Sequence, residues 1–82
     1  MTDEQLLARI VCDPKIMVGK PVIAGTRLTV EHVLNVLAHG MTEEEILSEY
    51  DGIAREDIQA CFLFAANSLS DTTFMPLSSE SV

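Results

Sequence analysis

The spacing of the apolar residues changes at Thr29, and this change constrains the fold more than any other feature of the chain. Before Thr29, short runs of strand-forming residues alternate with prolines and glycines, which is typical of short strands joined by tight turns. After Thr29, apolar residues recur at intervals of three and four, which is the spacing of one face of an α-helix. The sequence therefore predicts a mainly α fold with a short N-terminal β-hairpin over residues 9–29.

The strand-forming residues of this hairpin lie in three clusters, residues 10–11, 16–18 and 22–23, and they predict two or three short strands. Pro21 has no N–H to donate to a sheet, so its strand begins there or lies at an edge. Residues 3–9 precede the hairpin and are too few to form a stable helix unless they pack against another element.

Three helices are predicted to follow the hairpin. Thr29 is a suitable N-cap for the first helix, and Gly40 supplies the left-handed residue that commonly ends a helix. Thr42 and Glu45 have the spacing of a capping box, which opens the second helix. The predicted helices cover residues 30–39, 43–50 and 55–69.

The third predicted helix has an apolar face with members three or four residues apart. These members are Ile58, Cys61, Phe62, Ala65 and Leu69. Phe64 falls outside this face, which leaves two alternatives. Either the helix is buried on two sides, or Phe64 marks a contact surface.

A glycine break, a short capped helix, a glycine-containing turn and another helix follow one another over residues 40–65. This order is typical of helix-turn-helix proteins, in which the second helix enters the DNA major groove and an apolar residue, here Ile53, wedges between the helices. We therefore predict a three-helix, homeodomain-like bundle. Arg55 and Gln59 are placed to contact bases, but two exposed carboxylates between them, Glu56 and Asp57, would repel phosphates.

The formal net charge of the chain is −8, which is the wrong sign for a protein that depends on phosphate contacts. Four of the five basic residues nevertheless precede residue 28, and ten of the thirteen acidic residues lie from Glu31 onward. The four basic residues are Arg9, Lys15, Lys20 and Arg27. The chain thus combines a basic N-terminal element with an acidic helical body.

A chain of 82 residues has room for one domain with a small core, which we expect over residues 1–70, followed by a flexible C-terminal tail over residues 71–82. Because so small a core gains from pairing with a second copy, a homodimer is expected. No apolar run reaches about 20 residues, and the N-terminus begins with acidic residues. We therefore expect a cytoplasmic protein that does not contact membranes.

The sequence lacks the residue combinations that carry catalysis. His32 and His39 would lie two helical turns apart, about 10 Å along the axis, which is too far to share a metal ion. Cys12 and Cys61 form no CxxC pair. The glycines and cations of residues 19–27 lack the order GxxxxGK[ST] of a phosphate-binding loop. We expect neither an enzyme nor a bound cofactor or metal ion.

The string GKPVIAGTR over residues 19–27, together with Glu-Glu-Ile-Leu at 44–47 and Glu-Asp-Ile at 56–58, resembles the bacterial and archaeal family named domain of unknown function 433. The resemblance covers about residues 9–69, and it implies a short β-hairpin on a homeodomain-like helical core. Some members are similar to antitoxins of toxin–antitoxin pairs, whose partner is a PIN-like ribonuclease. Ala54 departs from the family, in which Ser or Thr often caps the last helix.

Two functions are compatible with these residues. The first is an antitoxin-like binding module, in which the acidic body occludes a basic, RNA-cleaving partner and apolar side chains add contact area. The candidate apolar contacts are Phe64, Phe74, Met75 and Leu77.

The alternative is a dimeric DNA-binding transcriptional regulator without a toxin partner. Lys15, Lys20 and Arg27 would then contact phosphates, while Arg55 and Gln59 would read bases. The two functions are compatible, because an antitoxin can also repress its own operon. A purely structural dimer with another protein or small-molecule partner is a third alternative.

Overall fold

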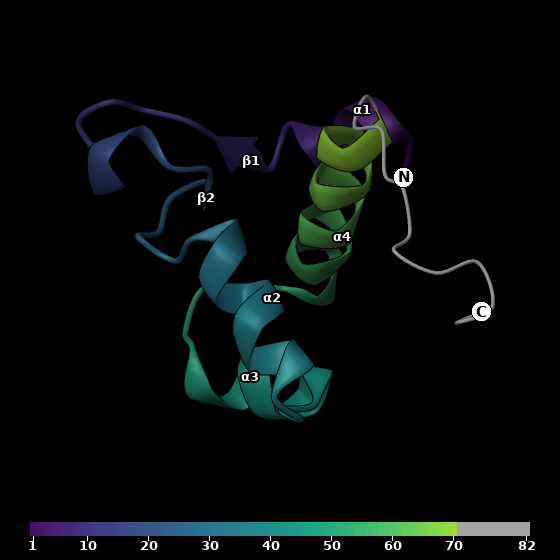
Figure 1. Cartoon of the computed structure of the whole chain (residues 1–82). Helices are drawn as coiled ribbons and strands as arrows, with labels where there is room; N and C mark the ends of the chain where they lie inside the picture. The colour runs from purple at the N-terminus through teal and green to yellow at the C-terminus, as the bar shows by residue number, and fades with distance from the viewer. Residues whose placement is uncertain (71–82) are drawn as a thin grey trace, which may run out of the picture.

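The computed structural model describes residues 1–70 and consists of helices around a short β-hairpin (Figure 1). The predicted fold class, mainly α with a short N-terminal hairpin, is confirmed, and the three predicted helices agree with the observed ones to within one residue at each end. The predicted tail over residues 71–82 lies outside the described residues. The elements in chain order are α1 (Asp3–Leu7), β1 (Ile10–Val11), the 3₁₀ turn η1 (Met17–Gly19), β2 (Val22–Ile23), α2 (Val30–Ala38), α3 (Glu43–Glu49) and α4 (Arg55–Ser70).

The hairpin is a two-stranded antiparallel sheet in which Ile10 pairs with Ile23 and Val11 pairs with Val22. Both residues of β2 are fully buried and Ile23 belongs to the core, while β1 contacts α4. In Figure 1 the long connection between β1 and β2 extends to one side, away from α4.

Of the two predicted alternatives, the one with a third strand at residues 16–18 is wrong, because a 3₁₀ turn forms there. Met17 and Val18 have φ angles of 51° and 58°, which belong to the left-handed region. The turn is closed by hydrogen bonds that Gly19 N–H donates to the Ile16 carbonyl and Lys20 N–H donates to the Met17 carbonyl. Apolar residues here have no neighbouring strand to pack against, and Val18 is 94% exposed.

Residues 3–7 form a helix because its first turn is capped and because it packs against another helix. Thr2 and Gln5 form a capping box that satisfies the N-terminal backbone groups of α1. The helix also packs against α4, which provides the tertiary support that five residues need. Figure 1 shows α1 beside the C-terminal end of α4.

The predicted caps of α2 and α3 are confirmed. The Thr29 hydroxyl accepts the His32 N–H at the start of α2. At the start of α3, the Thr42 hydroxyl accepts the Glu45 N–H, and the Glu45 carboxylate accepts the Thr42 N–H. Each helix therefore begins at the residue that can satisfy its first free N–H groups.

The core lies where β2 and the three longer helices meet. Its buried members come from all four elements and comprise Ile23, Val30, Val33, Ile46, Ile58 and Cys61. None of the helices in residues 1–70 combines the length and hydropathy needed to cross a bilayer.

The predicted apolar face of α4 is wrong at two positions. Phe62 is 49% exposed and Leu69 is 66% exposed, whereas Ala60 is fully buried and Phe64 packs against the core. The helix is turned relative to the prediction because two partners lie on different sides of it. The core covers Ile58, and α1 covers the face of Phe64.

Candidate interaction surfaces

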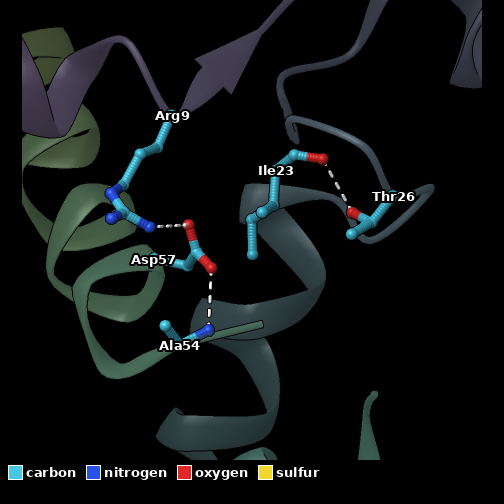
Figure 2. A network of polar contacts seen from close by, with 5 residues as sticks. All are labelled: Arg9, Ile23, Thr26, Ala54 and Asp57. Carbon is cyan, nitrogen blue, oxygen red and sulfur yellow. Dashed lines mark hydrogen bonds and ion pairs between the residues drawn. The ribbon is translucent and has the colours of Figure 1, made fainter. Parts of the chain in front are cut away.

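A carboxylate at the start of α4 joins three parts of the chain (Figure 2). Arg9 Nη1 donates a hydrogen bond to Asp57 Oδ1 at 2.9 Å, and the Ala54 N–H donates to Asp57 Oδ2 at 2.8 Å. The side chain of Asp57 is 8% exposed and that of Arg9 is 31% exposed. Arg9 therefore stabilises the contact between the N-terminal segment and α4, and its charge is neutralised there.

This network also compensates for the missing hydroxyl at residue 54. In a capping box, the side chain at the third helical position reaches back to the backbone N–H of the cap residue. Asp57 makes this half of the box even though Ala54 cannot make the other half. An acid three residues after the cap position was the signal in the sequence, and the prediction that Asp57 is an exposed residue that repels phosphates overlooked it.

The Gly-Thr pair before Arg27 forms the turn that carries the chain from β2 towards α2. The Thr26 hydroxyl donates to the Ile23 carbonyl at 2.7 Å, as Figure 2 shows, and accepts the Leu28 N–H at 3.0 Å. Gly25 has a φ of 80°, which an L side chain rarely adopts. These contacts give the string at residues 19–27 a structural role and leave the Arg27 side chain exposed.

The predicted nucleic-acid contacts differ in their surroundings. Lys20 forms an ion pair with Glu31 at 3.0 Å, and Arg55 forms one with Glu43 at 3.2 Å. The two cations without an ion pair among residues 1–70 are Lys15 and Arg27, and Gln59 is exposed on α4.

These candidates do not form one surface. Lys15 and Lys20 lie on the connection between β1 and β2, which extends away from α4 in Figure 1. Arg55 and Gln59 lie in the first turns of α4. The structure therefore separates two of the predicted phosphate contacts, Lys15 and Lys20, from the predicted base contacts.

Arg27 borders an open groove of about 330 Å³ between the turn after β2 and the segment that joins α3 to α4. The groove is lined by Thr26, Arg27, Leu28, Glu49, Tyr50, Asp51 and Ile53. Tyr50 is held in place by a hydrogen bond of 2.9 Å between its hydroxyl and His32 Nε2, with the two rings in edge-to-face contact. Ile53, the predicted wedge, packs against the core.

Acidic residues dominate α3, the turn after it and the first turn of α4. We call this set, without Asp57 because Arg9 neutralises its charge, the acidic segment; it consists of Glu43, Glu44, Glu45, Glu49, Asp51 and Glu56. Its one cation is Arg55, which Glu43 pairs. The pKa of the Glu45 carboxyl lies below its ordinary value. The main cause is the hydrogen bond from the Thr42 backbone N–H, and the second is hydrogen bonding with the Thr42 side chain. The segment therefore carries a strong negative charge at neutral pH.

Titratable side chains elsewhere in residues 1–70 do not converge. Burial, with a smaller contribution from the charge of Asp57, raises the pKa of the Cys61 thiol to about 11, so this thiol stays protonated at neutral pH. Cys12 is exposed and unpaired. Across residues 1–70, the side chains of His, Cys, Asp and Glu nowhere gather in the groups of three that could hold a metal ion.

Three of the four predicted apolar contacts lie outside the described residues. Phe74, Met75 and Leu77 lie beyond residue 70. Phe64 is half-buried against the core and also lines an open pocket of about 340 Å³ with Leu7, Asn67 and Ser68. Phe62 and Leu69, which were predicted to lie on the buried face of this helix, are surface residues, and their separation of seven residues places both on one side of it.

Comparison with known proteins identifies the family. The model of the family described as "Protein of unknown function (DUF433)" matches residues 10–65, and no curated protein matches the chain. A crystal structure of a DUF433 member protein from Anabaena variabilis resembles this fold with a TM-score of 0.71 and 25% sequence identity. The similarity covers 78% of this chain and 63% of that one, so this chain spans less than two thirds of that protein's length. The chain belongs to the DUF433 family.

Proposed function

We propose that this protein is a non-enzymatic, antitoxin-like binding module that neutralises a PIN-like ribonuclease in the cytoplasm. The observation that carries the proposal is the acidic segment, in which six carboxylates, apart from the Asp57 that Arg9 pairs, stand against one cation over α3, the turn after it and the first turn of α4. A ribonuclease must attract a polyanion, so its RNA-binding surface is basic. An acidic surface on a rigid pair of helices is complementary to such a surface.

The geometry of α4 supports a protein partner over DNA at this end of the molecule. In a helix-turn-helix protein the first turns of the second helix approach the bases. Here the guanidinium of Arg55 is engaged by Glu43, and Glu56 stands beside it with its negative charge. DNA approaching this end would meet uncompensated carboxylates, whereas a cationic protein surface would be attracted by them.

The test is the affinity of the purified protein for a PIN-like ribonuclease of the same organism, measured by titration calorimetry. Glu49→Lys reverses one charge in the acidic segment, and Glu4→Lys makes the same change on α1. Both residues are exposed, and neither side chain forms a hydrogen bond within residues 1–70. The two variants therefore differ in where the charge is reversed and not in the kind of substitution.

We expect Glu49→Lys to weaken binding about tenfold and Glu4→Lys to leave it within about twofold. Equal effects of the two substitutions would mean that the acidic segment is not the contact. The absence of binding by the unaltered protein would overturn the proposal itself.

A second candidate function, DNA binding by a dimer, is favoured by one observation on the hairpin side. Lys15 and Arg27 are exposed and have no ion pair within residues 1–70, so their charges are available to phosphates. Lys20 joins them, because an exposed pair such as Lys20–Glu31 contributes little stability. These contacts would let the same protein repress its own operon.

Salt dependence tests this second candidate. If the hairpin cations contact phosphates, the affinity for operator DNA falls steeply with salt, and Lys20→Ala with Arg27→Ala abolishes the gel shift. Unchanged DNA affinity in this double variant would rule out the hairpin as the phosphate contact.

A further inference from the structure

Among residues 1–70, no other element covers one face of α4, the longest helix described, and we propose that this face binds the same face of a second copy in an antiparallel dimer. The face is formed by Phe62, Ala66 and Leu69, which we call the outer stripe. Phe62 is 49% exposed, Leu69 is 66% exposed and Ala66 is exposed. The stripe lies on the opposite side of α4 from Phe64, which faces α1 and the core.

The spacing of the outer stripe suits contact between two helices. Its members are separated by four and then three residues, and the exposed Gln59 and Arg55 continue this alternation towards the start of α4. This is the spacing of the a and d positions of a coiled coil, where side chains of one helix insert between those of another. A small residue between two large ones allows the helix axes to approach closely.

The charge of the molecule selects this surface for a second copy. The chain carries −8, so the net electrostatic interaction between two copies is repulsive. Residues 58–70 contain no charged residue, although they form most of α4 and the outer stripe is exposed. A second copy can therefore approach α4 here without placing carboxylates opposite carboxylates.

Charge also selects the antiparallel direction. The acidic segment lies at the N-terminal end of α4, where Glu43 contacts Arg55. A parallel pair would bring the two acidic segments together, whereas an antiparallel pair places them at opposite ends of helices about 24 Å long. Around a two-fold axis near Ala66, Phe62 of each copy packs against Leu69 of the other, which is the self-complementary arrangement of a symmetric dimer.

The extent of the outer stripe implies weak association. Two turns of helix bury less than the roughly 1,600 Å² of a standard interface, so we expect a dissociation constant of about 10 µM or weaker. This inference does not depend on the proposed ribonuclease partner, which would bind the acidic segment at the other end of α4.

Sedimentation equilibrium on the full chain, at total concentrations from about 5 µM to about 500 µM, tests the dimer. We expect the apparent mass of the unaltered protein to rise from monomer towards dimer across this range. The variant Ala66→Glu/Leu69→Glu is expected to stay monomeric throughout. The control Val18→Glu/Ala38→Glu introduces the same charges at two exposed positions elsewhere, and it is expected to dimerise like the unaltered protein. Circular dichroism of both variants tests whether they keep their helices.

The direction of the pair has its own readout. In a Cys12→Ser background, Ala66→Cys is expected to form an intermolecular disulfide on mild oxidation, because the two copies of residue 66 face each other at the axis. Val18→Cys in the same background is the matched control and is expected to cross-link far more slowly. A dimer that persists in the stripe variant would overturn the proposal. So would an unaltered protein that remains monomeric at the highest concentration, for instance because another segment of the chain covers the stripe.

Discussion

At the scale of single residues, Asp57 has the most consequential position in the described chain. One carboxylate oxygen binds Arg9 and the other binds the Ala54 N–H, so its removal leaves a half-buried guanidinium and an uncapped helix. We expect Asp57→Ala to lower the free energy of unfolding by about 2–3 kcal/mol.

Denaturant unfolding of Arg9→Ala, Asp57→Ala and the double variant measures this coupling. Because both single variants break the same contact, the loss in the free energy of unfolding of the double variant should be smaller than the sum of the losses of the two single variants. A strictly additive loss would show that the Arg9–Asp57 contact contributes nothing.

Val18 provides the opposite case, a residue whose replacement should stabilise the protein. It is a β-branched residue with a φ of 58°, and its side chain is 94% exposed. The left-handed conformation costs an ordinary L-residue about 1–2 kcal/mol, and asparagine tolerates it better. Val18→Asn should therefore raise the free energy of unfolding by about 0.5–1 kcal/mol, measured by urea unfolding. A loss of stability would mean that the apolar side chain is needed where it stands.

At the scale of elements, and among those described after the hairpin, α4 is the helix whose cap residue lacks a hydroxyl, since α2 and α3 begin after Thr29 and Thr42. Asp57 already makes the returning half of a capping box there, so a hydroxyl at residue 54 would complete it. We expect Ala54→Ser to raise the thermal midpoint, with a gain of about 0.5–1 kcal/mol in the free energy of unfolding. The same substitution at Ala38, the exposed last residue of α2, should give no gain.

The capping box of α3 makes part of the stability dependent on pH. Because the pKa of Glu45 in the folded state lies below its ordinary value of 4.5, its ionised form stabilises the fold above that pH. The contribution is lost as the pH falls through the folded-state pKa. Glu45→Gln keeps an acceptor without the charge, so its stability should fall less than that of the unaltered protein between about pH 6 and about pH 3. Parallel curves from chemical unfolding would contradict this assignment.

Most elements could be predicted because their boundaries depend on local chemistry. Thr29 and Thr42 cap the helices that their positions in the sequence indicated, and the apolar spacing after Thr29 located all three helices. The predictions were wrong where contacts between distant parts of the chain determine the local structure. Residues 16–18 are strand-forming but have no strand beside them, and the orientation of α4 depends on its contact with α1.

At the scale of the whole molecule, the separation of charge along the chain was visible in the sequence, but the pairing of the charges was not. Three of the five cations are bound by acids distant in the sequence, as Arg9 is by Asp57. Composition alone therefore overstated the basic character of the N-terminal element. What composition did indicate, an acidic helical body, is carried in the structure by the acidic segment of α3 and α4.

If the acidic segment neutralises a ribonuclease, this protein should stop RNA cleavage, and the most direct measurement is the rate of cleavage by a PIN-like ribonuclease of the same organism as the protein is added. We expect cleavage to fall to its background rate at about one protein per ribonuclease, and we expect Glu49→Lys to require about ten times more protein for the same effect. Cleavage that continues unchanged in the presence of saturating protein would rule out neutralisation by this protein.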